Sequence, residues 1–179
     1  MGRGSRFSFK AGRLPGMRFR DEHEFRGVVS EAFYRHRALI VAALPRAEIE
    51  HIGATAVPGA LTKGDLDLLV RVSKPDFALA SERLRSLYQV NQSENWSEGF
   101  ASFRETPEDE VPVGVQLVVA NGLDDRLFIS WREYLRNDPD VLERYNSFKR
   151  AQIGAEADAY IEAKAKFFEA IFDDWGARI

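Results

Sequence analysis

The chain contains no cysteine, and this absence removes several kinds of chemistry. Without thiols, the protein has no cysteine nucleophile, no disulfide scaffold and no cysteine-ligated zinc site. Long apolar runs are missing as well, since no segment approaches the ~20 residues that a membrane span requires. We therefore expect no membrane partner. A cytoplasmic location fits the lack of cysteine.

Basic charge is not in excess either. The chain has 25 Lys and Arg residues against 28 Asp and Glu residues, a formal net charge of -3. No broad basic field is available, so general nucleic-acid binding is not expected. The 179 residues are 45% hydrophobic, which suffices for one core. We predict a single domain over residues 21–179.

The first twenty residues differ from the rest. They carry basic and glycine residues before any acid, and they lack the apolar stretch of a secretory signal. We predict that residues 1–20 form a disordered basic leader. The alternative is a leader that contacts nucleic acid or an organelle import receptor.

Hydrophobic periodicity predicts an α+β fold. A helix is expected over residues 24–44, ending before Pro45, and strands over 48–52 and 65–72. A further helix should follow residue 73. Strands are expected at 88–93, 100–104 and 111–120, and helices at 123–137, 139–153 and 157–175. This order indicates a mixed β-sheet flanked by an N-terminal helix and a C-terminal helical region.

Two carboxylates stand at the start of the second predicted strand. Because side chains alternate along a strand, Asp65 and Asp67 should share one face while Leu66 and Leu68 enter the core. Their Cα atoms should lie roughly 6.6 Å apart. That spacing suits two Mg²⁺ or Mn²⁺ ions about 3.5–4 Å apart, the arrangement that clamps a phosphoryl displacement. The alternative is a solvated acidic strand end.

A small-residue turn precedes these carboxylates. Gly53, Ala54 and Thr55 form a Gly-small-Thr segment, in which glycine permits tight backbone and exposed N–H groups make an anion-binding concavity. Turn and carboxylates together favour a ligand that contains both phosphate and metal.

The same residues resemble a known family. The run from Glu50 to Gly59, the Asp65-Leu-Asp67 strand and the helical tail are similar to the GrpB family of the nucleotidyltransferase superfamily. The resemblance implies a nucleotidyltransferase-like fold over the chain from about residue 20. The tail contributes Trp131-Arg-Glu-Tyr-Leu135, Asn137-Asp-Pro139, Tyr145, Phe148-Lys149, Tyr160-Ile-Glu-Ala-Lys164 and Phe167-Phe168.

From the residues and this resemblance, we expect a metal-dependent nucleotidyltransferase that uses Mg²⁺ or Mn²⁺. Its partners would be a nucleoside triphosphate and an unknown small-molecule or macromolecular acceptor. Asp65 and Asp67 would hold metal and act catalytically, and the turn at Gly53, Ala54 and Thr55 would bind phosphate. Two alternatives stay open: a non-catalytic module that binds a nucleotide or phosphorylated metabolite, and a purely structural protein.

The chain departs from the family pattern at two positions. Ala54 stands where relatives usually have serine, which removes one hydroxyl. In the strand at 111–120, where active nucleotidyltransferases of other families tend to place a third carboxylate, the polar residue is Gln116. An amide is a poor Mg²⁺ ligand and no base at neutral pH. Glu108, Asp109 or Glu110 could supply the third carboxylate.

Three basic residues are candidates for contacting phosphate. Lys63 could pair with Asp65 or touch a triphosphate, or be solvated in its turn. Lys164 interrupts the apolar stripe of the last helix, so it either snorkels to solvent or meets an anion at the core's edge. Arg132 could clamp phosphate or form an ion pair on the helix surface.

Three residues have weaker claims. His51, before the turn, could act as a base near pH 7 or simply hydrogen-bond neighbouring backbone. Lys149 and Tyr145 fit ordinary packing between helices.

Overall fold

A five-stranded mixed sheet forms the centre of the protein. The computed structural model describes residues 18–105 and 111–176. The strands run in the order β2-β4-β7-β6-β5, with β4 and β7 parallel and the other neighbours antiparallel. A two-stranded sheet pairs β1 with β3. The strands are β1 (Arg20–Asp21), β2 (Glu48–Ile52), β3 (Leu61–Thr62), β4 (Leu66–Val72), β5 (Gln89–Asn91), β6 (Phe100–Glu105) and β7 (Val113–Val119).

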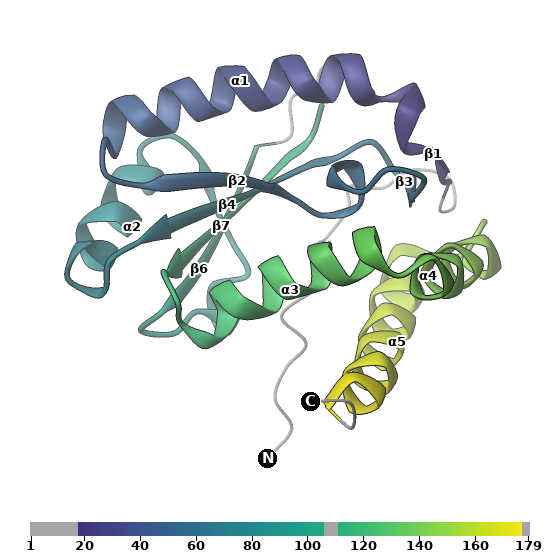
Figure 1. Cartoon of the computed structure of the whole chain (residues 1–179). Coiled ribbons are helices and arrows are strands. Elements are labelled where there is room, and N and C mark those ends of the chain that lie inside the picture. The colour runs from purple at the N-terminus through teal and green to yellow at the C-terminus, as the bar shows by residue number, and fades with distance from the viewer. Residues whose placement is uncertain (1–17, 106–110, 177–179) are drawn as a thin grey trace.

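Helices cover both faces of this sheet, as the alternation of its side chains requires. Leu66, Leu68 and Val70 point to one face and pack with Ile40 of the first helix. Leu69 points the other way and packs with Phe128 of the third. Figure 1 shows α1 along one side of the sheet, α3 along the other, and α4 and α5 at one end. The helices are α1 (Arg26–Ala43), α2 (Phe77–Arg85), α3 (Leu123–Asn137), α4 (Pro139–Ala151) and α5 (Ala157–Gly176).

Local sequence accounts for the helix boundaries. α1 ends at Ala43, two residues before Pro45, which cannot continue a helix. At the α3–α4 junction, the Asp138 side chain accepts hydrogen bonds from the backbone N–H groups of Asp140 and Val141, both at 3.1 Å, with Pro139 in the first turn. This N-cap lets α4 start directly after α3 and turn back over the end of the sheet.

The predicted α+β architecture with a mixed sheet is confirmed. Two details differ. Asp65 lies one residue before β4 rather than inside it. The leader was predicted to reach residue 20, but Arg20 pairs with Thr62 across β1 and β3, so residues 18–20 belong to the folded part. Residues 1–17 of the predicted leader lie outside the described residues.

A second apolar cluster joins the three C-terminal helices to the segment that follows β2. Trp131 of α3, Tyr145 of α4 and Phe168 of α5 pack together with Val57 and Ala60. Ring contacts tie them, with the Trp131 and Phe168 centroids 4.9 Å apart. The polar residues of the candidate site lie between this cluster and the end of the sheet. Over the described ranges, no helix is both long and apolar enough to cross a membrane.

Candidate functional site

Strand register brings the glycine turn against the second carboxylate. β2 and β4 are antiparallel with Ile52 opposite Asp67, so Gly53, the next residue after Ile52, lies beside Asp67. Gly53 has a φ of 75°, which favours glycine, and a Cβ placed on it would lie 2.1 Å from Oδ2 of Asp67. The turn can therefore approach the carboxylate only because residue 53 has no side chain.

The two carboxylates line one pocket but differ in their partners. Asp65 Oδ2 lies 3.1 Å from Lys63 Nζ. Burial opposes ionisation of Asp65, yet the Lys63 ammonium group brings its pKa below the usual value. Asp67 Oδ1, in contrast, is buried and accepts no hydrogen bond. Burial, and then the charge of Asp65, raise the pKa of Asp67 to about 7. An unsatisfied buried oxygen is costly, and a bound cation would satisfy it.

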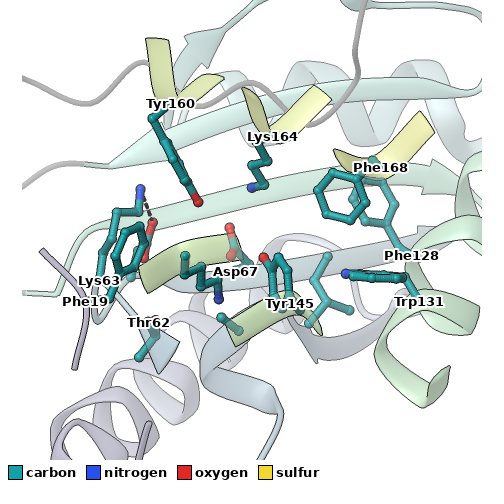
Figure 2. Close-up of a pocket in the computed structure, with 15 residues that line it drawn as sticks. Phe19, Thr62, Lys63, Asp67, Phe128, Trp131, Tyr145, Tyr160, Lys164 and Phe168 are labelled. Atoms are coloured by element: carbon teal, nitrogen blue, oxygen red, sulfur yellow. Dashed lines mark ion pairs between the residues drawn. The ribbon is translucent and has the colours of Figure 1, made fainter. Parts of the chain in front are cut away.

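Three lysines from different elements reach the same pocket. Lys63 precedes β4, Lys149 belongs to α4 and Lys164 to α5. Figure 2 shows Lys164 pointing into the pocket toward Asp67. The charge of Asp65 raises the pKa of Lys63 to about 12. Burial, followed by the charge of Lys63, lowers the pKa of Lys164 to about 8. Positive charge near the carboxylates therefore favours the binding of an anion in this pocket.

Lys149 is the most enclosed of these lysines. Its side chain is 2% exposed, its Nζ donates a hydrogen bond to the Leu61 carbonyl, and the same nitrogen lies 3.8 Å from the centroid of the Tyr145 ring. Burial, and then the positive charge of Lys164, lower the pKa of Lys149 well below its usual value. A lysine held in this way cannot snorkel to solvent.

Aromatic side chains form the pocket walls. They come from the N-terminal segment, α3, α4 and α5, and Figure 2 shows them around the charged groups. Such walls exclude water and strengthen the electrostatic interactions inside. The wall residues are Phe19, Phe128, Trp131, Tyr145, Tyr160 and Phe168.

Six of the residues chosen from the sequence lie together in this pocket, and two lie outside it. The six are Gly53, Ala54, Lys63, Asp65, Asp67 and Lys164.

Thr55 lies on the other side of the turn. Its hydroxyl donates to the Asp65 carbonyl at 2.9 Å, so His51 Nε2, at 3.0 Å from the same oxygen, must be the donor to it. Burial, and then the charges of Arg136 and Arg132, lower the pKa of His51 to about 4. His51 therefore makes a structural hydrogen bond, as one alternative predicted, but its partner is the Thr55 hydroxyl and not backbone. With this pKa, the imidazole is neutral at pH 7.

Arg132 also lies away from the pocket. Its guanidinium group pairs with Glu50 at 2.8 Å and with Glu133 at 2.8 Å, and it donates to the His51 carbonyl at 2.9 Å. The ion-pair alternative predicted for Arg132 is therefore present. Its contacts tie α3 to β2, the strand that delivers the glycine turn.

The neighbour of Asp67 on β7 is not the residue expected from the sequence. The register places Gly114 opposite Asp67, whereas Gln116 lies opposite Leu69 and Ser102 and is 2% exposed. The position beside Asp67 thus has no side chain at all. Across residues 18–105 and 111–176, no group of three His, Cys, Asp or Glu side chains could hold a metal ion. The candidate acids Glu108, Asp109 and Glu110 lie outside those ranges.

Sequence reasoning gave too little weight to Lys149 and Tyr145. Both line the pocket and both are buried. Their spacing of four residues on one helix was the available signal, because it places them on the same face. What the spacing could not show is that this face meets the carboxylates and not merely another helix.

The fold and the pocket together define the class of protein. A mixed sheet with two carboxylates on β4 and the segment before it, a glycine turn against them and a helical region closing over them is a nucleotidyltransferase-like architecture. Cid1, a poly(U) polymerase whose structure is known with its short product ApU, shares this fold with a TM-score of 0.50 at 15% identity, over 73% of this chain and 40% of Cid1.

Within that class, the chain belongs to the GrpB family, whose profile matches residues 25–174. A crystal structure of the conserved protein GrpB from Enterococcus faecalis superposes with a TM-score of 0.60 at 24% identity, covering 83% of this chain and 95% of that one. A UPF0157 protein of Vibrio cholerae is 32% identical over 155 residues, 87% of this chain and 81% of its own. A UPF0157 protein of Streptomyces coelicolor is 30% identical over 152 residues, 83% of this chain and 80% of its own.

Proposed function

We propose that this protein is a metal-dependent transferase that moves a nucleotidyl or related phosphoryl group from a nucleoside triphosphate to an acceptor. One observation carries the proposal. The buried, unpartnered Oδ1 of Asp67 lies in the same pocket as Asp65 and three lysines. Carboxylate oxygens are the ligands that Mg²⁺ and Mn²⁺ prefer, and lysine ammonium groups bind phosphate.

The residues present fit a divalent ion. Asp65 and Asp67 would hold it, and Asp67 would gain the partner that Oδ1 lacks. Such an ion withdraws electron density from a phosphoryl oxygen and neutralises charge that develops there. Among residues 18–105 and 111–176, two carboxylates line the pocket, so the coordination set that these residues offer is small.

The remaining groups would act on the triphosphate. The N–H groups of the turn at Gly53 and Ala54 and the amines of Lys63 and Lys164 would bind its oxygens. In nucleotidyl transfer, a bond forms between an acceptor oxygen and the α-phosphorus, the bond from that phosphorus to the bridging oxygen breaks, and pyrophosphate departs. In transfer of the terminal phosphoryl group, the attacked atom is the γ-phosphorus and a nucleoside diphosphate departs. The acceptor's proton passes to a carboxylate of the pocket and then to solvent.

A second function has one observation in its favour. Gly114, beside Asp67, offers no carboxylate where a third would stand. A pocket with two carboxylates and three lysines can hold a nucleotide or phosphorylated metabolite without transferring anything. In that case the protein would be a binding module derived from a transferase.

Thermal unfolding with Mn²⁺ and each of the four nucleoside triphosphates tests the proposal. We expect the two ligands together to raise the melting temperature more than either alone, and Asp67→Asn to lose that gain. Glu82→Gln, an exposed position on α2, is the matched acid-to-amide control. An equal gain in Asp67→Asn and in the unaltered chain would contradict metal binding at this pocket.

Turnover is then measured as release of pyrophosphate or nucleoside diphosphate from the triphosphate that binds. Release that depends on Asp65 and Asp67 supports the transferase. Binding that needs both carboxylates but yields neither product with any offered acceptor class, including water, sugars, amines and RNA ends, favours the binding module.

A further inference from the structure

The pocket contains more positive than negative side chains. Three lysines, Lys63, Lys149 and Lys164, face two carboxylates, Asp65 and Asp67. With all five ionised, as a bound cation and a bound polyphosphate would favour, these side chains have a net charge of one positive unit. This balance is unusual for a site expected to hold two divalent cations, and it leads to an inference that rests on the proposed function.

We propose that this pocket holds one divalent ion, and that the ammonium group of Lys164, supported by Lys149, takes the electrostatic role of a second ion. The expectation of two ions, drawn from the spacing of the carboxylates, is thereby replaced. The phosphate chain of the ligand would lie between one metal ion on Asp67 and the amines of α4 and α5.

Within the part of the chain that the structure describes, the number of available oxygen ligands supports a single ion. Mg²⁺ and Mn²⁺ need carboxylate or carbonyl oxygens from the protein in addition to water and phosphate. Asp65 Oδ2 already pairs with Lys63 at 3.1 Å, and the buried oxygen that lacks a hydrogen-bond partner is Oδ1 of Asp67. On β7, the neighbouring position is Gly114, so a second ion would find no further side-chain ligand on that strand at this point.

Charge supports the same conclusion. Two divalent ions would raise the positive excess of the pocket from one unit to five, whereas one ion raises it to three. The pocket is walled by aromatic rings that exclude water, and repulsion between like charges is screened little in such surroundings. A bound polyphosphate balances the smaller excess far better than the larger one.

The position of Lys164 suits the electrostatic role of a second ion. It extends from α5 into the pocket toward Asp67 and does not turn out to solvent (Figure 2). Its Nζ lies 5.7 Å from the centroid of the Phe168 ring, within the aromatic wall. Lys149 lines the same pocket, fixed by the Leu61 carbonyl and the Tyr145 ring. Ammonium groups fixed by packing in this way stabilise charge without a metal's demand for ligands.

Counting Mn²⁺ ions on the full chain tests the inference directly. Free Mn²⁺ is measured by electron paramagnetic resonance during titration, with and without inorganic tripolyphosphate. We expect one Mn²⁺ per chain, no spin-coupled signal, and at least a tenfold loss of affinity in Asp67→Asn.

A gain-of-site variant makes the test sharper. Gly114→Asp supplies a carboxylate beside Asp67 and should bind a second Mn²⁺ with a spin-coupled signal, whereas Gly114→Asn, of the same size but uncharged, should still bind one. Circular dichroism checks that both variants fold. If Gly114→Asp does not fold, the count on the unaltered chain still decides the question.

The role of Lys164 has its own measurement. Lys164→Met should keep one Mn²⁺ and bind tripolyphosphate at least tenfold more weakly. Lys166→Met, at an exposed position on the same helix paired with Glu162, should bind it as the unaltered chain does. Unchanged affinity in Lys164→Met would overturn the inference.

The number of bound Mn²⁺ ions distinguishes a failure of this inference from a failure of the proposed transferase function. Two coupled Mn²⁺ ions on the unaltered chain would overturn the single-ion site and leave the proposed transferase standing. No Mn²⁺ binding, with or without tripolyphosphate, would overturn both.

Discussion

Gly53 and Asp67 are in such close contact that a single methyl group on the glycine would lie 2.1 Å from the Asp67 carboxylate. The contact arises because antiparallel pairing sets Ile52 opposite Asp67, and the chain then turns through a φ of 75° at Gly53. The position of the Asp67 carboxylate therefore depends on the path of the turn, so a substitution at Gly53 should alter binding at Asp67.

The first prediction concerns Gly53→Ala. A side chain in the left-handed region costs about 1–2 kcal/mol, and here it would also displace Asp67. We expect lower stability and lost Mn²⁺ binding. Gly154→Ala is the matched control, since Gly154 has a φ of 82° but nothing within 4 Å of an added Cβ. It should show the backbone penalty alone in chemical denaturation, with Mn²⁺ binding intact. Equal losses of stability in the two variants would argue against the contact with Asp67.

The second prediction concerns stability against pH in the metal-free protein. Asp67 has a folded-state pKa of about 7, above its ordinary 3.8, because of burial and the neighbouring Asp65. A raised pKa means that the folded state retains a proton the unfolded chain has released, so stability falls as pH rises from about 4 to 7. Asp67→Asn should thus be more stable than the unaltered chain at pH 8, by on the order of 1–2 kcal/mol after solvent screening, and the gain should shrink toward pH 4.

Asp65→Asn should change the stability of the protein in the opposite direction to Asp67→Asn. The pKa of Asp65 is lowered despite its burial, because Lys63 favours the ionised form. Its contribution to stability is present above the unfolded-state pKa and is lost as pH falls through the folded value. Asp65→Asn should therefore be less stable at neutral pH. Thermal unfolding between pH 4 and 8 measures both variants, and the same sign for the two would show that their pKa values are not shifted in opposite directions.

The third prediction concerns Lys149. Burial lowers its pKa, so the empty pocket holds the proton of Lys149 less tightly than solvent would, and a bound polyphosphate should raise that pKa. Calorimetry with tripolyphosphate in buffers of different ionisation enthalpy should show proton uptake by the unaltered chain. Lys149→Met should show less uptake and at least tenfold weaker binding, with stability equal or higher because no amine is buried. Lys166→Met is the control, and undiminished uptake in Lys149→Met would contradict the assignment.

The fourth prediction separates Arg132 from the ligand. Arg132→Gln breaks the contacts with Glu50 and the His51 carbonyl, and should lower stability by about 1–3 kcal/mol. Tripolyphosphate affinity, measured well below the melting temperature, should be unchanged because Arg132 does not line the pocket. Arg126→Gln, at an exposed position of α3, should change neither quantity. A tenfold drop in affinity at unchanged stability would instead place Arg132 at the ligand.

Much of the fold followed from local pattern. Apolar periodicity predicted α1 to α5 and the strands of the five-stranded sheet to within a few residues, whereas β1 and β3 were not predicted. Alternation correctly placed Leu66 and Leu68 in the core. The pairing of Lys63 with Asp65 was also one of the predicted alternatives, since two residues of separation keep the side chains near each other. These features depend on neighbours along the chain, so the sequence alone determined them.

Tertiary structure decided which distant groups share the pocket. Strand register placed Gly114, rather than Gln116, beside Asp67, and helix docking brought Lys149 and Tyr145 to the carboxylates while directing Arg132 to β2. A shift of register or a rotation of one helix changes such contacts without altering any local pattern, because periodicity fixes which face is apolar but not what that face meets. The sequence therefore determined that carboxylates, a glycine turn and lysines are available, and the packing of the helices against the sheet decided which of them form one site.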